Sequence, residues 1–284
     1  MITTMQLPAS KSVFKPGEIA LIGAGPGDAE LLTIKALRFL QQADVVVYDR
    51  LVSKDILDLM PVSTRRIYVG KELNRHSVPQ DKINETLVNL ANQQLKVVRL
   101  KGGDSFIFGR GSEELNYLLE HQLSAHVIPG ITAASGCTTY AGIPLTHRGV
   151  AHSCSFITGH FSKNGELILP WDNYVDAGQT LVFYMGIKSS GVIAEQLIKH
   201  GRAATTPAAI IQSGTQKGQR VWRTTLQDLP QLIDSEQVKS PSLLVIGDVV
   251  NAVQSGVEPD AKENGAITEI PAYFAAAAAL EKTG

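Results

Sequence analysis

The stretch LKGGDSFIFGRGSEE, residues 100–114, decides how the rest of the chain is interpreted. It brings four glycines and several charged side chains together: Gly102, Gly103, Gly109, Gly111, Asp104, Arg110, Glu113 and Glu114. Glycine loses more backbone freedom on folding than any other residue, so such a cluster indicates positive φ angles or the close approach of a ligand. A run of alternating apolar residues at 96–100 leads into it, and a helical pattern follows it at 115–119. We expect a ligand-binding loop at the carboxyl end of a strand; an ordinary turn with solvated charges is the alternative.

The composition is that of a globular protein with a large core. The chain has 284 residues, of which 44% are hydrophobic and 19% charged, enough for two modest domains or one large one. Its formal net charge is -1, so no overall field attracts nucleic acid or an anionic membrane surface. Neither is expected as a partner, and an anionic ligand would have to be held by individual arginines.

The two cysteines, Cys137 and Cys154, stand without metal-ligand spacing. They are interpreted as buried free thiols of a reducing compartment, and no metal site is expected. No apolar run approaches the roughly 20 residues that a membrane span needs, and the first residues lack the basic and apolar regions of a signal peptide. The sequence therefore predicts a cytoplasmic protein.

Residues 18–130 alternate between short apolar strands and helices. Strands are predicted at 19–22, 45–48, 66–69 and 97–100, with helices at 31–40, 56–60 and 79–90. This alternation implies an α/β domain with a parallel sheet, whose ligands gather outside the carboxyl ends of the strands. Asp49, Lys71 and Asp104 all stand at such ends. Residues 1–17 carry no periodic pattern and are expected to form a flexible N-terminal arm.

Residues 131–253 have more strand character and are expected to form a second α/β domain with a mixed sheet. Strands are predicted at 153–158, 180–185, 208–212, 220–223 and 242–246, with helices at 191–200 and 226–233. Residues 254–284 contain a run of alanines and are predicted to be a frayed C-terminal tail.

A second glycine turn, GAGPGD at 23–28, suggests a dinucleotide-binding site as one alternative. The fingerprint of such sites is G-x-G-x-x-G, whereas the glycines here are at 23, 25 and 27. Asp49 stands where a ribose-binding acid would be, but Pro26 removes a backbone donor that a pyrophosphate would need. A turn that only packs a strand against a helix is the other alternative.

Several segments resemble the uroporphyrinogen-III C-methyltransferases, a branch of the tetrapyrrole methylase superfamily. They are GAGPGD at 23–28, YDRLV at 48–52, GK at 70–71 with His76, Gln80 and Asn84 after it, the stretch at 100–114, VIPGITAASG at 127–136, AGIPLTHRG at 141–149, VFYMG at 182–186 and IGDVV at 246–250. The resemblance extends from about residue 18 to residue 250. Where the family commonly has proline after GGD, this chain has Ser105, which leaves the loop less rigid.

The resemblance implies an enzyme that transfers methyl groups from S-adenosylmethionine to two pyrrole carbons, C2 and C7, of uroporphyrinogen III. The products would be precorrin-1, then precorrin-2, a precursor of siroheme, cobalamin or heme d1, together with S-adenosylhomocysteine. It also implies two α/β domains with the active site in the cleft between them, and a homodimer. A sulfonium methyl group is already activated, so the chemistry needs alignment and a proton acceptor rather than a metal.

The resemblance assigns the cofactor to residues from both domains. They are Pro26, Gly102, Gly103, Asp104, Ile107, Thr132, Ala133, Met185 and Gly214. Glycines would allow close backbone approach, Asp104 would bind ribose or amino groups, and Met185 would contact adenine.

The substrate carries eight carboxylates, so Arg50, Arg110 and Arg148 are candidates to bind it. By resemblance, Asp49 is the proton acceptor and Lys71 the proton donor. Glu113 is a second acid or base candidate, because it lies one helical turn after Arg110; a helix-start acid favoured by the macrodipole is its alternative role. We expect one of Asp49 and Glu113 to remove the pyrrole proton.

Two other functions remain open at this point. A related methylase could act on a later corrinoid, a diphthamide precursor or a ribosomal RNA ribose, although YDRLV and PLTHR argue against the first two and the near-neutral charge against RNA. A non-catalytic binding protein or a dinucleotide enzyme is the third possibility. Pro26 argues against the dinucleotide enzyme.

Overall fold

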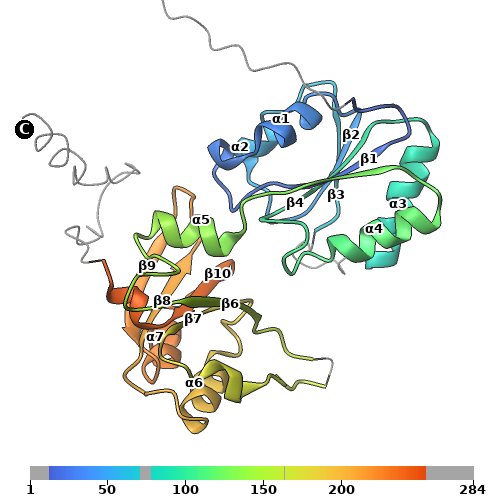
Figure 1. Cartoon of the computed structure of the whole chain (residues 1–284). Helices are drawn as coiled ribbons and strands as arrows, with labels where there is room; N and C mark the ends of the chain where they lie inside the picture. Colours follow the sequence, from blue (N-terminus) through green and yellow to red (C-terminus); the bar gives the residue numbers. More distant parts are fainter. Residues whose placement is uncertain (1–12, 71–77, 163, 254–284) are drawn as a thin grey trace, which may run out of the picture.

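Two five-stranded sheets, each flanked by its own helices, make up the fold (Figure 1). This computed structural model describes residues 13–70, 78–162 and 164–253. Residues 1–12 of the expected arm, the expected tail and Lys71 lie outside the described residues. Phe14, within the predicted arm, is 2% exposed and packs in a core of the first domain. The prediction of two α/β domains, one sheet parallel and the other mixed, is confirmed.

The first sheet is parallel throughout and has the order β3-β2-β4-β1-β5. Its strands are β1 (Ile19–Gly23), β2 (Val45–Tyr48), β3 (Arg65–Tyr68), β4 (Val97–Lys101) and β5 (Ala125–Ile128). The neighbours β1 and β4 lead to helices on opposite faces of the sheet, so a crevice opens beyond their carboxyl ends. The predicted loops at 23–28 and 102–110 both lie at this crevice.

Alternating side chains of these strands build two cores. The helices α1 (Ile34–Leu40) and α2 (Lys54–Leu57) cover one face, where Ala20 and Leu100 are buried. The helices α3 (Gln80–Asn92) and α4 (Gly111–Glu120) cover the other, over Leu21 and Val97 (Figure 1). Residues 99 and 101 follow the period of Val97 and therefore point toward α3 and α4.

The second sheet has the order β6-β7-β10-β8-β9, with β6 and β7 parallel and the other pairs antiparallel. Its strands are β6 (Ser153–Thr158), β7 (Gln179–Tyr184), β8 (Pro207–Gln212), β9 (Arg220–Thr225) and β10 (Ser242–Ile246). The helices α6 (Ser190–Lys199) and α7 (Leu229–Ser235) pack on one face, and α5 (Ala133–Tyr140) packs on the other.

The element boundaries differ from the prediction at informative places. The predicted strand at 97–100 extends to Lys101, and the predicted helix at 115–119 already begins at Gly111. Strand β5 was not predicted, because its four residues AHVI are too short to show a period. None of the helices in the described ranges is long and apolar enough to cross a membrane.

Candidate active site

A pocket of about 790 Å³ lies between the two sheets and is lined by loops of both. The first domain contributes the loops after β1, β2 and β4, and the second contributes segments after β7 and β8 and before β10. A pocket of this volume accommodates a ligand of cofactor size.

The floor of the pocket is formed where three glycine-containing segments meet. The amide of Gly103 donates to the carbonyl of Gly25 over 2.7 Å, and the amide of Gly25 donates back over 3.1 Å. A Cβ on Gly130 would lie 2.4 Å from the carbonyl oxygen of Gly103, so no larger residue fits there. Gly103 also has a φ of +67°, a backbone conformation that favours glycine. The glycines thus permit the loops after β1, β4 and β5 to converge.

Asp104 holds this arrangement together through its carboxylate. One oxygen accepts a hydrogen bond from the amide of Phe106 at 2.9 Å, and the other accepts one from the amide of Gly130 at 3.1 Å. Ser105 follows it, with its hydroxyl buried and without a partner among the described residues. The backbone carbonyl of Ser105 accepts a hydrogen bond from the amide of Gly111 at 2.9 Å. Backbone contacts therefore fix the loop, although Ser105 stands where the resembled family commonly has proline.

Tyr184 joins the second domain to the same site. Its hydroxyl accepts the amide of Ala134 at 2.9 Å and lies 2.5 Å from the hydroxyl of Thr132. A side chain at the end of β7 therefore caps the N-terminus of α5, where Thr132 has no side-chain cap of its own. The Phe108 ring from the glycine loop packs against the Tyr184 ring at 5.0 Å between centroids.

Unusual backbone conformations gather around the pocket. Eight non-glycine residues in the described ranges have a positive φ, and four of them line it: Phe108, Arg110, Met185 and Ser213. Such conformations cost energy and collect at ligand sites, where the surrounding structure holds them in place.

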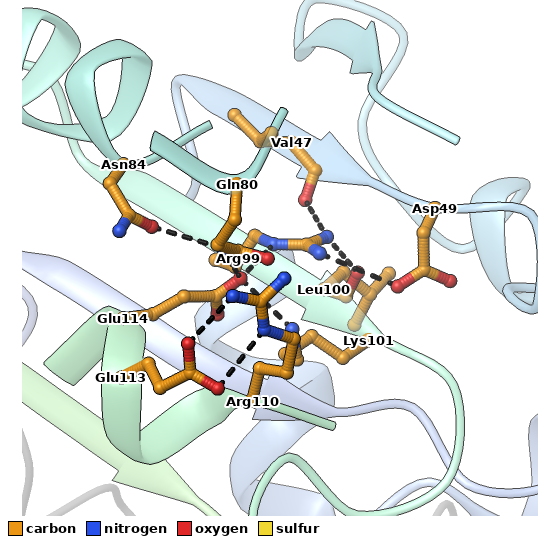
Figure 2. Close-up of polar contacts among 10 residues, drawn as sticks. All are labelled: Val47, Asp49, Gln80, Asn84, Arg99, Leu100, Lys101, Arg110, Glu113 and Glu114. Atoms are coloured by element: carbon orange, nitrogen blue, oxygen red, sulfur yellow. Dashed lines mark hydrogen bonds and ion pairs between the residues drawn. The ribbon is translucent and has the colours of Figure 1, made fainter. Parts of the chain in front are cut away.

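A network of charged side chains extends from the pocket wall, which Asp49, Arg99 and Lys101 line, to the buried Glu114 (Figure 2). One oxygen of Glu114 accepts hydrogen bonds from Arg99 Nε at 3.1 Å, Lys101 Nζ at 2.9 Å and Gln80 Nε2 at 3.0 Å. The other end of the Arg99 guanidinium lies 3.5 Å from a carboxylate oxygen of Asp49. Arg99, Lys101 and Glu114 are at most 4% exposed. Burial lowers the pKa of Lys101, and the charge of Arg99 lowers it further, whereas Glu114 and Asp49 act in the opposite direction.

Comparison with known proteins identifies the family that has this fold and site. A family model described as Tetrapyrrole (Corrin/Porphyrin) Methylases matches residues 18–230. The chain belongs to the tetrapyrrole methylases. The convergence of glycine loops on a pocket between two α/β domains is thus a feature of a methylase, and the dinucleotide alternative is set aside.

Two groups of relatives accompany this match. Siroheme synthases of Pseudomonas fluorescens (strain SBW25) and Pseudomonas aeruginosa (strain LESB58) are 59% and 58% identical over 237 and 234 residues, or 84% and 82% of this chain. These segments are 51% and 50% of those proteins, so the chain spans about half the length of the curated relatives it matches. A uroporphyrin-III C-methyl transferase of Thermus thermophilus, solved with S-adenyl homocysteine, is 36% identical with a TM-score of 0.72, covering 84% of this chain and 100% of that one.

All nine residues that the resemblance assigns to the cofactor line the pocket. Pro26 and the residues of the glycine loop stand on the first domain's side, and Thr132, Ala133, Met185 and Gly214 on the other. The lining residues fit the S-adenosylmethionine that the resemblance implies. The glycine backbone leaves room on one side, and Met185 offers apolar contact on the other. Both oxygens of Asp104 accept backbone amides, so positioning the loops is a function that sequence reasoning missed.

The residues predicted for catalysis and substrate binding divide into two sets. Asp49, Arg50 and Arg110 line the pocket. Glu113 and Arg148 are not among the lining residues, and Lys71 lies outside the described residues. Arg148 is exposed on the turn that pairs His147 with Ala151. These placements leave the roles of Glu113 and Arg148 as predictions.

Glu113 is bound to its neighbour instead of facing the pocket. Arg110 donates two hydrogen bonds to its carboxylate, at 3.0 Å and 2.7 Å. These bonds lower the pKa of Glu113, which makes it a weaker proton acceptor. Of these two acids, only Asp49 lines the pocket.

Sequence reasoning missed the network around Glu114 altogether. The signal was the strand VVRLK at 97–101, in which two basic residues occupy alternate positions of a buried strand. Alternate residues face the same side of a sheet, so their charges must find a partner there. That partner is Glu114, the neighbour of the predicted Glu113.

The remaining predictions concern cysteines and metals. Cys137 is buried and Cys154 is half-buried, so the expectation that both are buried is wrong for Cys154. Both are free. Burial raises the pKa of Cys137 to about 12 and that of Cys154 to about 11, so both thiols stay protonated near neutral pH and are poor nucleophiles. Within residues 13–70, 78–162 and 164–253, no group of three or more His, Cys, Asp or Glu is placed to hold a metal ion.

Proposed function

We propose that this chain transfers methyl groups from S-adenosylmethionine to C2 and C7 of uroporphyrinogen III, giving precorrin-2 through precorrin-1. The observation that carries the proposal is the convergence of the nine cofactor residues, Asp49 and two arginines on one pocket. The relatives support it, since a structural neighbour of matching length is a uroporphyrin-III C-methyl transferase. Because curated relatives that are 59% and 58% identical are siroheme synthases, siroheme is the product we expect the pathway to reach.

The pocket residues divide the work of the reaction. S-adenosylmethionine supplies an activated methyl group, and a pyrrole carbon attacks it while the sulfur–methyl bond breaks. Asp49 then accepts the proton that the cationic ring loses, because its carboxylate lines the pocket and is held by the Leu51 amide at 3.0 Å. Arg50 and Arg110 bind substrate carboxylates. The resemblance makes Lys71 the proton donor, and we expect Arg148 to bind the substrate from the second domain.

The glycine loop and α5 hold the cofactor from two sides. Gly102 and Gly103 let the backbone approach it, and Thr132 and Ala133 contact it from the capped helix end. Tyr184 keeps that helix end in place. Met185 covers an apolar part of the cofactor.

The proposal includes a cytoplasmic homodimer. Two free thiols agree with a reducing compartment, and the dimer rests on the resemblance. Sedimentation of the purified protein measures the dimer directly, and a monomer at micromolar concentration would contradict it.

Ligand-dependent stabilisation and methyl transfer test the proposed function together. S-adenosylhomocysteine should raise the melting temperature and NAD should leave it unchanged, because a ligand stabilises only the fold that binds it. Labelled S-adenosylmethionine should then label uroporphyrinogen III under anaerobic conditions. Stabilisation by NAD alone would contradict the cofactor assignment, and stabilisation by S-adenosylhomocysteine without labelling would contradict the substrate.

A further inference from the structure

The Arg99 guanidinium connects the buried Glu114 to the pocket residue Asp49. Its Nε donates to Glu114, its Nη1 donates to the carbonyls of Val47 and Leu100, and its Nη2 reaches Asp49 (Figure 2). The backbone contacts fix the plane of the guanidinium. A change at Glu114 is therefore transmitted to Asp49 by a rigid side chain rather than through solvent.

Glu114 is placed in a way that stability alone does not explain. One of its oxygens takes three donors, while Oε2 is buried and has no partner among the described residues. Taking ions out of water costs several kcal/mol each, so buried ion pairs contribute little net stability compared with apolar packing. An arrangement of this kind points to a role in the adjacent site.

The network is electrically balanced. Two positive side chains, Arg99 and Lys101, are matched by two negative ones, Glu114 and Asp49. Asp49 is the member that is open to the pocket, with 26% of its side chain exposed. Removing the charge of Glu114 leaves a net positive charge behind Asp49, and removing the charge of Lys101 leaves a net negative one.

We propose that Glu114 is a positioning residue for the Asp49 carboxylate, acting through Arg99 and Lys101 on its orientation and its charge. This inference rests on the proposed function, in which Asp49 accepts the proton. Besides Asp49, Arg99 and Lys101 of the network, the charged or titratable groups that line the same pocket are Arg50, Asp104, Arg110, Cys137, His160, Tyr184 and Lys188. Since Glu114 is buried and does not line the pocket, it acts through the side chains that bind it, which are the basic residues of β4 and Gln80.

The test uses two substitutions with opposite charge effects and one control. In E114Q the uncompensated positive charge favours the ionised Asp49, so the acidic limb of the rate–pH profile should move to lower pH. In K101M the uncompensated negative charge should move it to higher pH. E120Q changes an exposed acid at the end of the same helix and should leave the profile unchanged.

Two readouts separate this role from a structural one. Single-turnover methyl transfer gives the profile, and carbon-13 NMR of the aspartate carboxylates, with the Asp49 signal assigned from D49N, gives its titration midpoint without catalysis. We expect both to move in the same direction in each variant, with the maximal rate of E114Q lower by about tenfold. If E114Q does not fold, K101M alone carries the test.

Four outcomes are decisive. Opposite shifts in E114Q and K101M support the inference. Lower rates or melting temperatures with unshifted midpoints would show that the network is only structural and would overturn it. If D49N transfers methyl groups at the wild-type rate, the inference is overturned as well, because Asp49 would not be the proton acceptor. If the variants show shifted NMR midpoints but the wild-type protein transfers no methyl group, the proposed function is overturned instead. The coupling between Glu114 and Asp49 would then have no catalytic meaning.

Discussion

At the scale of single residues, the site depends on how each carboxylate is already engaged. Asp49 is fixed by one backbone amide and lies 3.5 Å from Arg99, with part of its surface open to the pocket. Glu113 gives both oxygens to Arg110, and Asp104 gives both to backbone amides. Of these three acids, Asp49 is the one available to take a proton from a ligand in the pocket.

The pair D49N and E113Q tests this distinction. With substrate saturating, D49N should lower the single-turnover rate by about 100-fold, because the amide cannot accept the proton. E113Q should change the rate by less than about threefold and act mainly on substrate affinity, through Arg110. Equal losses in the two variants would show that both acids take part, and a larger loss in E113Q would reverse the assignment.

At the scale of elements, the end of a strand in one domain fixes the start of a helix at the interface. Tyr184, the last residue of β7, caps α5, and α5 carries Thr132 and Ala133 at the pocket. Thr132 is the helix's own N-cap residue but makes no capping hydrogen bond to it. The position of these two residues therefore depends on a hydroxyl that lies 50 residues away in sequence.

Removing that hydroxyl should weaken cofactor binding. In Y184F the Ala134 amide loses its acceptor, so stability should fall by about 1 to 2 kcal/mol. The dissociation constant of S-adenosylhomocysteine, measured by calorimetry, should rise by about tenfold. Y117F on α4 is the matched control. An unchanged dissociation constant in Y184F would show that the Tyr184 cap is not needed for cofactor binding.

The glycine loop makes a second prediction at this scale. G103A introduces a side chain at a φ of +67°, which costs about 1 to 2 kcal/mol and shifts the Gly25 pairing. Stability and affinity for S-adenosylhomocysteine should both fall, as thermal melts and calorimetry will show. G218A, at a site with open space and no positive φ, should alter neither. If G103A behaves like G218A, the close packing of the glycine segments is not needed for binding.

The sequence predicted the parts of the site that depend on local chemistry. A glycine turn needs glycine wherever the rest of the chain lies, so the loops at 23–28 and 100–111 were recognisable before the structure. The phase of α4 was not, because the helix begins at Gly111 and turns Glu114 rather than Glu113 toward β4. Arg99 and Lys101 are buried because α3 and α4 pack over this face of the sheet, and the strand pattern at 97–101 indicates a buried partner without identifying it as Glu114.

At the scale of the whole molecule, the two domains share one pocket and are tied together beside it. The Asp28 carboxylate in the first domain accepts the hydroxyl of Tyr140 at 2.8 Å, and its amide donates to Thr215 at 3.1 Å. A Cβ on Gly27 would lie 2.6 Å from the side chain of Gln216, so the contact is close. The loops of both sheets are thus held in one arrangement around the ligand.

Two methyl transfers to one tetrapyrrole, both in this shared pocket, are the function proposed for the protein. The most direct measurement is mass spectrometry of uroporphyrinogen III after anaerobic incubation with the protein and excess S-adenosylmethionine. We expect two added methyl groups per tetrapyrrole, with one added methyl at early times and with both additions slowed by about 100-fold in D49N. If uroporphyrinogen III stays unmethylated after prolonged incubation with protein that still binds S-adenosylhomocysteine, the proposed methyl transfers are wrong.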